Sequence, residues 1–126
     1  MEIRRVADGM RYTLSFVDHE LLLVSDMIGN SFSGSANWAV PDHAYENVFG
    51  ISVERARQIF ESARKQWKEQ RSAEPIELDA KELRAIKIIF EHMLEKWDEN
   101  DFQTIANAKK IEAMAISNTL AREIAP

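Results

Sequence analysis

The stretch that decides the fold reads DAKELRAIKIIFEHMLEKW, residues 79–97. It opens with Asp79 followed three residues later by Glu82, a pair typical of a helix N-terminus, where each side chain bonds the other residue's backbone N–H. Apolar side chains then recur with helical spacing and form one seam along about four turns. These are Leu83, Ile86, Phe90, Met93 and Trp97. The stretch therefore predicts an amphipathic helix that buries one face.

Three further stretches carry the same spacing of apolar side chains. One begins after Asp18, a second follows Ser52, whose hydroxyl suits a helix cap, and a third occupies the alanine-rich end from about Ala108. In the second of these stretches the predicted seam contains Val53, Ala56, Phe60, Ala63 and Trp67. The sequence therefore predicts a mainly α protein with four amphipathic helices.

The segments between the helices also correspond. Residues 45–50 (YENVFG) and 102–107 (FQTIAN) share an aromatic residue, a Glu or Gln, a small polar residue, a β-branched residue, an apolar residue and a final Gly or Asn. Each half is entered from a short β-like stretch, at 12–16 and at 75–78. These similarities predict two related helix–loop–helix units, 12–71 and 75–126, which pack as one four-helix domain over residues 1–126.

The N-terminal arm has the pattern of a β-hairpin. Tyr12, Leu14 and Phe16 alternate with polar residues, and residues 7–9 (ADG) suit the turn after residues 3–6. An isolated two-stranded ribbon is barely stable in water, so we expect this short hairpin to lie on the helices.

Composition excludes several classes of function. The 126 residues hold 16 Lys and Arg against 21 Asp and Glu, a net charge of -5 that disfavours general binding to phosphate backbones. Cysteine is absent, which excludes disulfides, thiolate zinc sites and cysteine catalysis. The longest apolar run, residues 21–24, is too short to span a bilayer, and the N-terminus lacks the pattern of a signal peptide. We expect a cytoplasmic protein.

Catalytic and metal-binding patterns are weak. The chain has neither a Gly-x-Ser-x-Gly elbow nor a phosphate-binding glycine motif. His43 and Glu46, and likewise His92 and Glu95, lie three residues apart, but di-metal helical sites use the reverse order with several more carboxylates. The sequence therefore predicts no enzyme, no metal and no cofactor.

Negative charge is concentrated in the second half. Residues 1–71 carry 9 basic and 10 acidic side chains, for a net -1, whereas residues 72–126 carry 7 and 11, for a net -4. Four carboxylates gather where the helix at 79–97 is expected to end, and there they would oppose the helix dipole. We predict that they contact a basic partner, although they also suit a solubilising helix end. They are Glu95, Asp98, Glu99 and Asp101.

The loop at residues 29–41 supplies two apolar candidates for the same interface. Phe32 and Trp38 stand among small and polar residues, and aromatic side chains on loops often anchor partners. The alternative interpretation is that they hold the loop against the helices.

The β-like entry, the acid-rich helix start and the connectors resemble those of small bacterial helical proteins of uncharacterised or immunity type. The resemblance implies a protein that binds another protein without catalysis. We therefore predict a protein-binding module, for example an immunity-type inhibitor that occludes a basic toxin or nuclease. One alternative is a homo-oligomeric helical protein, such as a homodimer. Another is a DNA-binding regulator, although nucleic acid is disfavoured by the interleaved acids; its cations would be Arg57, Arg64, Lys68 and Arg71.

Overall fold

The computed structural model describes residues 1–5, 11–16, 18–32, 38–69 and 75–124. These residues form six helices and three strands. In chain order they are β1 (Glu2–Arg5), β2 (Arg11–Ser15), α1 (Asp18–Phe32), α2 (Asp42–Phe49), α3 (Val53–Lys68), β3 (Ile76–Asp79), α4 (Ala80–Lys96), α5 (Glu99–Ala106) and α6 (Lys110–Ile124). The mainly α class is confirmed. The helix count is corrected from four to six, because each predicted connector contains a short helix of its own.

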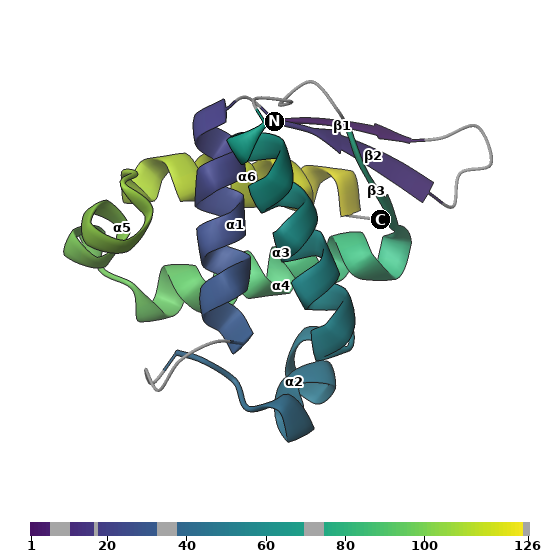
Figure 1. Ribbon diagram of the computed structural model, residues 1–126, viewed down its shortest axis with the longest axis horizontal. Coiled ribbons are helices and arrows are strands. Elements are labelled where there is room, and N and C mark those ends of the chain that lie inside the picture. The colour runs from purple at the N-terminus through teal and green to yellow at the C-terminus, as the bar shows by residue number, and fades with distance from the viewer. Residues whose placement is uncertain (6–10, 17, 33–37, 70–74, 125–126) are drawn as a thin grey trace.

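The long helices form two crossed pairs. Helix α1 packs along α3, and α4 packs along α6. Figure 1 shows the first pair in front of the second, with the small sheet at one end of the molecule. The short helices α2 and α5 lie at the periphery, where each connects the two long helices of its pair.

The predicted hairpin strands form, and a third strand joins them. Strand β2 pairs antiparallel with β1, and on its other edge it pairs antiparallel with β3, with Tyr12 opposite Leu78 and Leu14 opposite Ile76. These four side chains are buried. The sheet therefore ties the beginning of the first predicted unit to the beginning of the second. The predicted turn at residues 7–9 lies outside the described residues.

The long seam on α4 is confirmed. All five of its predicted apolar side chains are buried, and Trp97 follows the last residue of the helix as its C-cap. The predicted N-terminal pair also forms: Asp79 Oδ1 accepts from the Glu82 N–H at 2.7 Å, and Glu82 Oε1 accepts from the Asp79 N–H at 2.9 Å. Local sequence is enough to specify this helix, because the cap and the seam depend on nearby residues.

The seam predicted on α3 is partly wrong. The buried face carries Ile59 between Ala56 and Ala63, and Gln66 after them, while Phe60 is half-buried and Trp67 is 37% exposed. Helical spacing permits steps of three or four residues, so the apolar pattern alone did not decide which face turns inward. Small side chains on the buried face let α1 and α3 approach closely. Phe60 instead rests against Gly29 of α1, where an added Cβ would lie 2.6 Å from its ring.

Both short helices end in a left-handed residue. Gly50 has φ 91° and Asn107 has φ 49°, and the two occupy the same final position of the two similar connectors. The Gly50 N–H bonds the Glu46 carbonyl at 2.8 Å, which closes the last turn of α2. The order strand, long helix, short helix, long helix thus occurs in each half. That this order reflects a duplication stays a prediction.

Substitutions at the two left-handed residues, Gly50 and Asn107, should change the stability of the protein differently. Gly50→Ala should lower the free energy of unfolding by about 1–2 kcal/mol, because only glycine adopts this conformation without strain. A Cβ at Gly50 would meet nothing within 4 Å, so packing adds no further cost. Asn107→Gly is the matched control and should leave stability unchanged or slightly raised. Urea denaturation checks both, and equal stability of Gly50→Ala and wild type would contradict the expectation.

Candidate protein-binding surface

Three of the four predicted interface carboxylates belong to the start of α5. Asp98 caps this helix by accepting from the Asp101 N–H at 2.8 Å, and Asp101 accepts from the Asp98 N–H at 3.0 Å. Glu99 accepts from the backbone N–H of Lys110 at 2.8 Å and so connects α5 to α6. These carboxylates therefore have structural partners inside the fold.

The structure places three of the four clustered carboxylates at a helix N-terminus, not at the helix C-terminus that the sequence predicts. Helix α4 ends at Lys96, and the next residues begin a new helix, so Asp98, Glu99 and Asp101 face a helix N-terminus. Negative charge is favourable there. Glu95 alone lies in the last turn of α4, and its side chain is exposed. Binding of a basic partner by this cluster stays a prediction, without the unfavourable energy that first suggested it.

Trp38 holds its segment against the end of α4. Its ring meets the ring of Trp97 edge to face, with centroids 5.8 Å apart. Its carbonyl oxygen lies 2.8 Å from Nε2 of His92, which donates to it, and the His92 ring also packs edge-on against Phe49 at 5.3 Å. Both Trp38 and His92 are therefore half-buried and engaged within the fold.

Phe32 lies where α1 meets α2 and α3. Its half-buried ring contacts Phe60 with centroids 5.7 Å apart and Tyr45 at 6.4 Å, both edge to face. The guanidinium carbon of Arg57 stands 5.3 Å from the ring centroid. Phe32 is thus both a packing residue and the first member of a surface that continues along α3.

Tyr45 of α2 is connected to the end of α1 by a buried hydrogen bond. Its hydroxyl lies 2.6 Å from Ser31 Oγ, which in turn donates to the Ile28 carbonyl at 2.5 Å. Since Ser31 has one hydroxyl proton, Tyr45 must be the donor in their bond. Burial raises the pKa of Tyr45 to about 12, and the charge of Arg57 opposes this effect only in part. The hydroxyl therefore stays protonated and keeps donating throughout the physiological range.

A line of aromatic and cationic side chains begins at Phe32 of α1 and continues along the solvent side of α3, and we call it the α3 strip. The guanidinium carbon of Arg64 lies 5.7 Å from the ring centroid of Phe60 and 5.9 Å from that of Trp67. Contacts of this kind between a cation and an aromatic ring hold the guanidinium in place. The strip comprises Phe32, Arg57, Phe60, Arg64, Trp67 and Lys68.

Arg64 also pairs with a carboxylate of α1. Its Nη1 lies 3.4 Å from Oδ1 of Asp26, whose side chain is 13% exposed. Burial raises the pKa of Asp26, and the charge of Arg64 opposes this effect only in part. Burial thus disfavours the charged form of Asp26, and the contact with Arg64 helps to orient the guanidinium.

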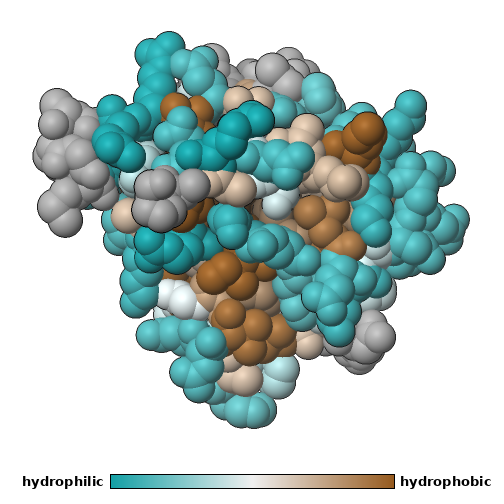
Figure 2. All heavy atoms as spheres, turned by 180° about the vertical axis from the view of Figure 1, so that it is seen from behind, coloured by the Kyte–Doolittle hydropathy of each residue, from teal (hydrophilic) through white to brown (hydrophobic). Residues whose placement is uncertain are grey.

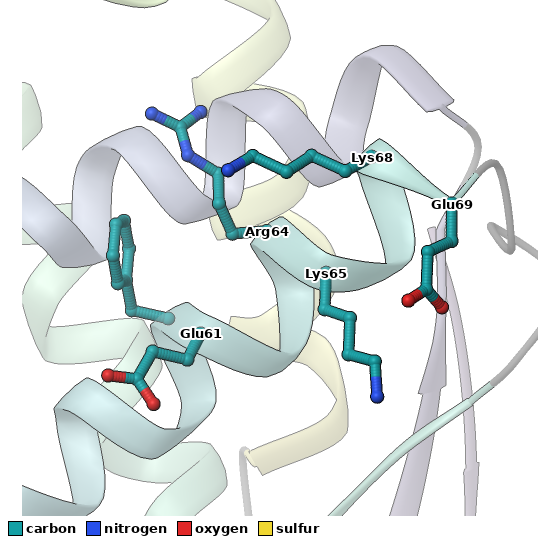
Figure 3. Close-up of a pocket in the computed structure, with 6 residues that line it drawn as sticks. Glu61, Arg64, Lys65, Lys68 and Glu69 are labelled. Atoms are coloured by element: carbon teal, nitrogen blue, oxygen red, sulfur yellow. The ribbon is translucent and has the colours of Figure 1, made fainter.

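The strip borders a shallow groove of about 350 Å³. Figure 3 shows its lining, which consists of one aromatic and five charged side chains along α3 and its C-cap. The lining residues are Phe60, Glu61, Arg64, Lys65, Lys68 and Glu69.

The sequence identifies Phe32, Arg57, Arg64 and Lys68 as surface candidates. It places the other two aromatics of the strip, Phe60 and Trp67, in the buried seam. A signal was present in the sequence, because aromatics at 60 and 67 and arginines at 57 and 64 recur at spacings of three and four residues. That spacing places them together on one face of a helix. Arg71, the last predicted cation, lies outside the described residues.

The described residues contain no group of three or more His, Asp or Glu side chains placed to hold a metal ion. Across the same residues, no helix combines the length and apolar character needed to cross a bilayer. Comparison with protein-family models, curated proteins and solved structures finds no match. The resemblance to immunity-type proteins therefore stays a prediction.

Removal of the buried carboxylate of Asp26 should raise the stability of the protein, by an amount that depends on pH. A raised pKa means that the folded state binds the Asp26 proton more tightly than the unfolded state, so the destabilising effect appears as the pH rises above the usual value near 3.8. Asp26→Asn should therefore be at least as stable as wild type at pH 7, with the difference vanishing in acid. Thermal unfolding across this pH range measures it. Arg64→Gln should be less stable at pH 7 because it leaves Asp26 without its cation, and a stable Arg64→Gln would contradict the expectation.

Proposed function

We propose that this protein is a non-catalytic protein-binding module and that the α3 strip is its contact surface. The observation that carries the proposal is the position of Arg64 between the rings of Phe60 and exposed Trp67. Tryptophan and arginine dominate the binding energy of many protein interfaces. A guanidinium already held between two rings and a carboxylate loses little conformational freedom on binding, which favours affinity.

The charge pattern favours protein over DNA as the partner. Arg57 lies 3.6 Å from a carboxylate of Asp42, and Arg64 pairs with Asp26. These pairs reduce the positive charge that the strip presents to a phosphate backbone. Glu54, Glu61 and Glu69 also interrupt the cations along α3, and the whole chain carries a net charge of -5. A DNA-binding regulator is therefore the less supported alternative.

The structure offers less support for a homo-oligomer than for a module that binds another protein. Ile111 and Met114 of α6 are 69% and 47% exposed and lie one turn apart. Figure 2 shows the side of the molecule on which α4 and α6 lie, and there hydrophobic atoms reach the surface in several places between hydrophilic ones. Two side chains cover far less than the roughly 800 Å² per partner that stable interfaces bury. We therefore use α6 as a control surface.

An immunity-type inhibitor is the specific form of the proposal that the sequence predicts. In that form the strip would bind a toxin in the cytoplasm and block its active surface, while Glu95 and the carboxylates at the start of α5 would attract the basic regions of the toxin. Charged side chains outside the central contact act mainly on association rate and specificity.

The proposal predicts which surface substitution abolishes binding. Purified protein should form a complex with the product of an adjacent reading frame, and calorimetry should show that Trp67→Ala weakens it by about thirtyfold or more, since hot-spot residues contribute about 2 kcal/mol. Ile111→Ala, which removes an exposed apolar side chain from α6, should bind as wild type does. Unchanged binding by Trp67→Ala would refute the strip as the contact surface. Salt-dependent DNA binding in gel shifts, without any protein complex, would refute the protein-binding function.

A further inference from the structure

Two cations of the α3 strip converge at one end of the groove. Arg64 and Lys68 are one helical turn apart on the same face of α3, and both line the groove. Figure 3 shows the Lys68 side chain extending toward Arg64, while Lys65 and Glu69 point to the other side of the helix. Like charges at this spacing repel each other, so their convergence has an energetic cost unless an anion lies between them.

The protein itself supplies only part of the negative charge that would balance Arg64 and Lys68. Within the ranges that the structure describes, Asp26 is the one carboxylate within ion-pair distance of either cation, and it contacts Arg64 from the α1 side. Lys68 is exposed, and Arg64 is 34% exposed. The guanidinium therefore has N–H groups left to donate on its solvent side, next to a lysine that can donate as well.

We propose that Arg64 and Lys68 together bind a carboxylate side chain of the partner, and that an adjacent apolar side chain of the same segment packs on Phe60 and Trp67. This inference rests on the proposed function and identifies the partner segment as acidic and amphipathic. A guanidinium matches a carboxylate with paired hydrogen bonds, and the lysine adds a mobile point charge. Once the apolar side chain of the partner covers the neighbouring rings, water is excluded from the ionic contact, which strengthens it.

A carboxylate fits this end of the groove better than a chain of phosphates does. Glu61 also lines the groove, so an extended polyanion lying along it would meet negative charge as well as the two cations. A single carboxylate beside an apolar residue avoids that glutamate. Phe60 and Trp67 also offer an aromatic surface beside the two cations, which suits an apolar side chain of the same segment.

Two charge reversals on different helices test this inference. Lys68 is exposed in the last turn of α3, and Lys96 is exposed in the last turn of α4 and is not among the lining residues of the groove. Lys68→Glu and Lys96→Glu therefore change the net charge and the charge of a helix end alike. The probe is the capped peptide acetyl-Leu-Glu-Leu-Glu-amide, and its neutral control replaces both glutamates with glutamine. Titrations at constant ionic strength follow the indole N–H resonance of Trp67 by NMR. Circular dichroism verifies that both variants stay folded.

We expect the acidic peptide to shift the Trp67 resonance, and Lys68→Glu to weaken its binding by about tenfold, the loss of one charge-assisted contact. Lys96→Glu should bind within about twofold of wild type, since Lys96 belongs to α4 and does not line the groove. Equal losses in the two variants, equal binding of the neutral peptide, or no binding of the acidic peptide would each overturn the inference. Tighter binding of a short oligothymidylate, lost in Lys68→Glu, would overturn it in favour of nucleic acid. Failure here leaves the proposed function standing if Trp67→Ala still abolishes binding to the partner protein.

Discussion

The architecture depends on the left-handed residue that ends each short helix. At Gly50 and at Asn107 the backbone turns so that a third helix can run back along the first. The first residue of each similar connector, Tyr45 or Phe102, is fully buried and fixes the short helix in place before that turn. Without the reversal, α3 could not pack along α1, and the surface on its outer side would not exist.

Close packing between α1 and α3 in turn creates the α3 strip. The inner face of α3 carries alanines at positions 56 and 63, which are fully buried. Larger aromatic side chains are then left at the edge, where Phe60 rests on Gly29 and Trp67 remains accessible. The arginines lie between them because side chains three or four residues apart share a helix face. A binding surface is thus a consequence of how the core is filled.

Charge has two separate uses in this molecule. The carboxylates at the start of α5 bond backbone N–H groups and stabilise a helix end, and Asp79 and Glu82 do the same at the start of α4. The cations of the strip project from the fold instead, with Asp26 and Asp42 as nearby anions of the protein itself. Net charge did not distinguish these uses, because a capping carboxylate and a partner-facing carboxylate contribute equally to composition.

The sequence by itself determined the helical class, the seam of α4, its reciprocal cap and the strands of the N-terminal hairpin. Each of these depends on residues a few positions apart, so spacing and hydrogen-bonding chemistry suffice to predict them. It also identified Phe32, Arg57, Arg64 and Lys68 as surface candidates. Only the tertiary structure decided that Phe60 and Trp67 face outward, that Asp26 meets Arg64, that β3 joins the hairpin and that Trp38 packs on Trp97. Those features require contacts between segments distant in sequence, and on a helix a shift of one residue, about 100°, is enough to move a side chain from the buried face to its edge.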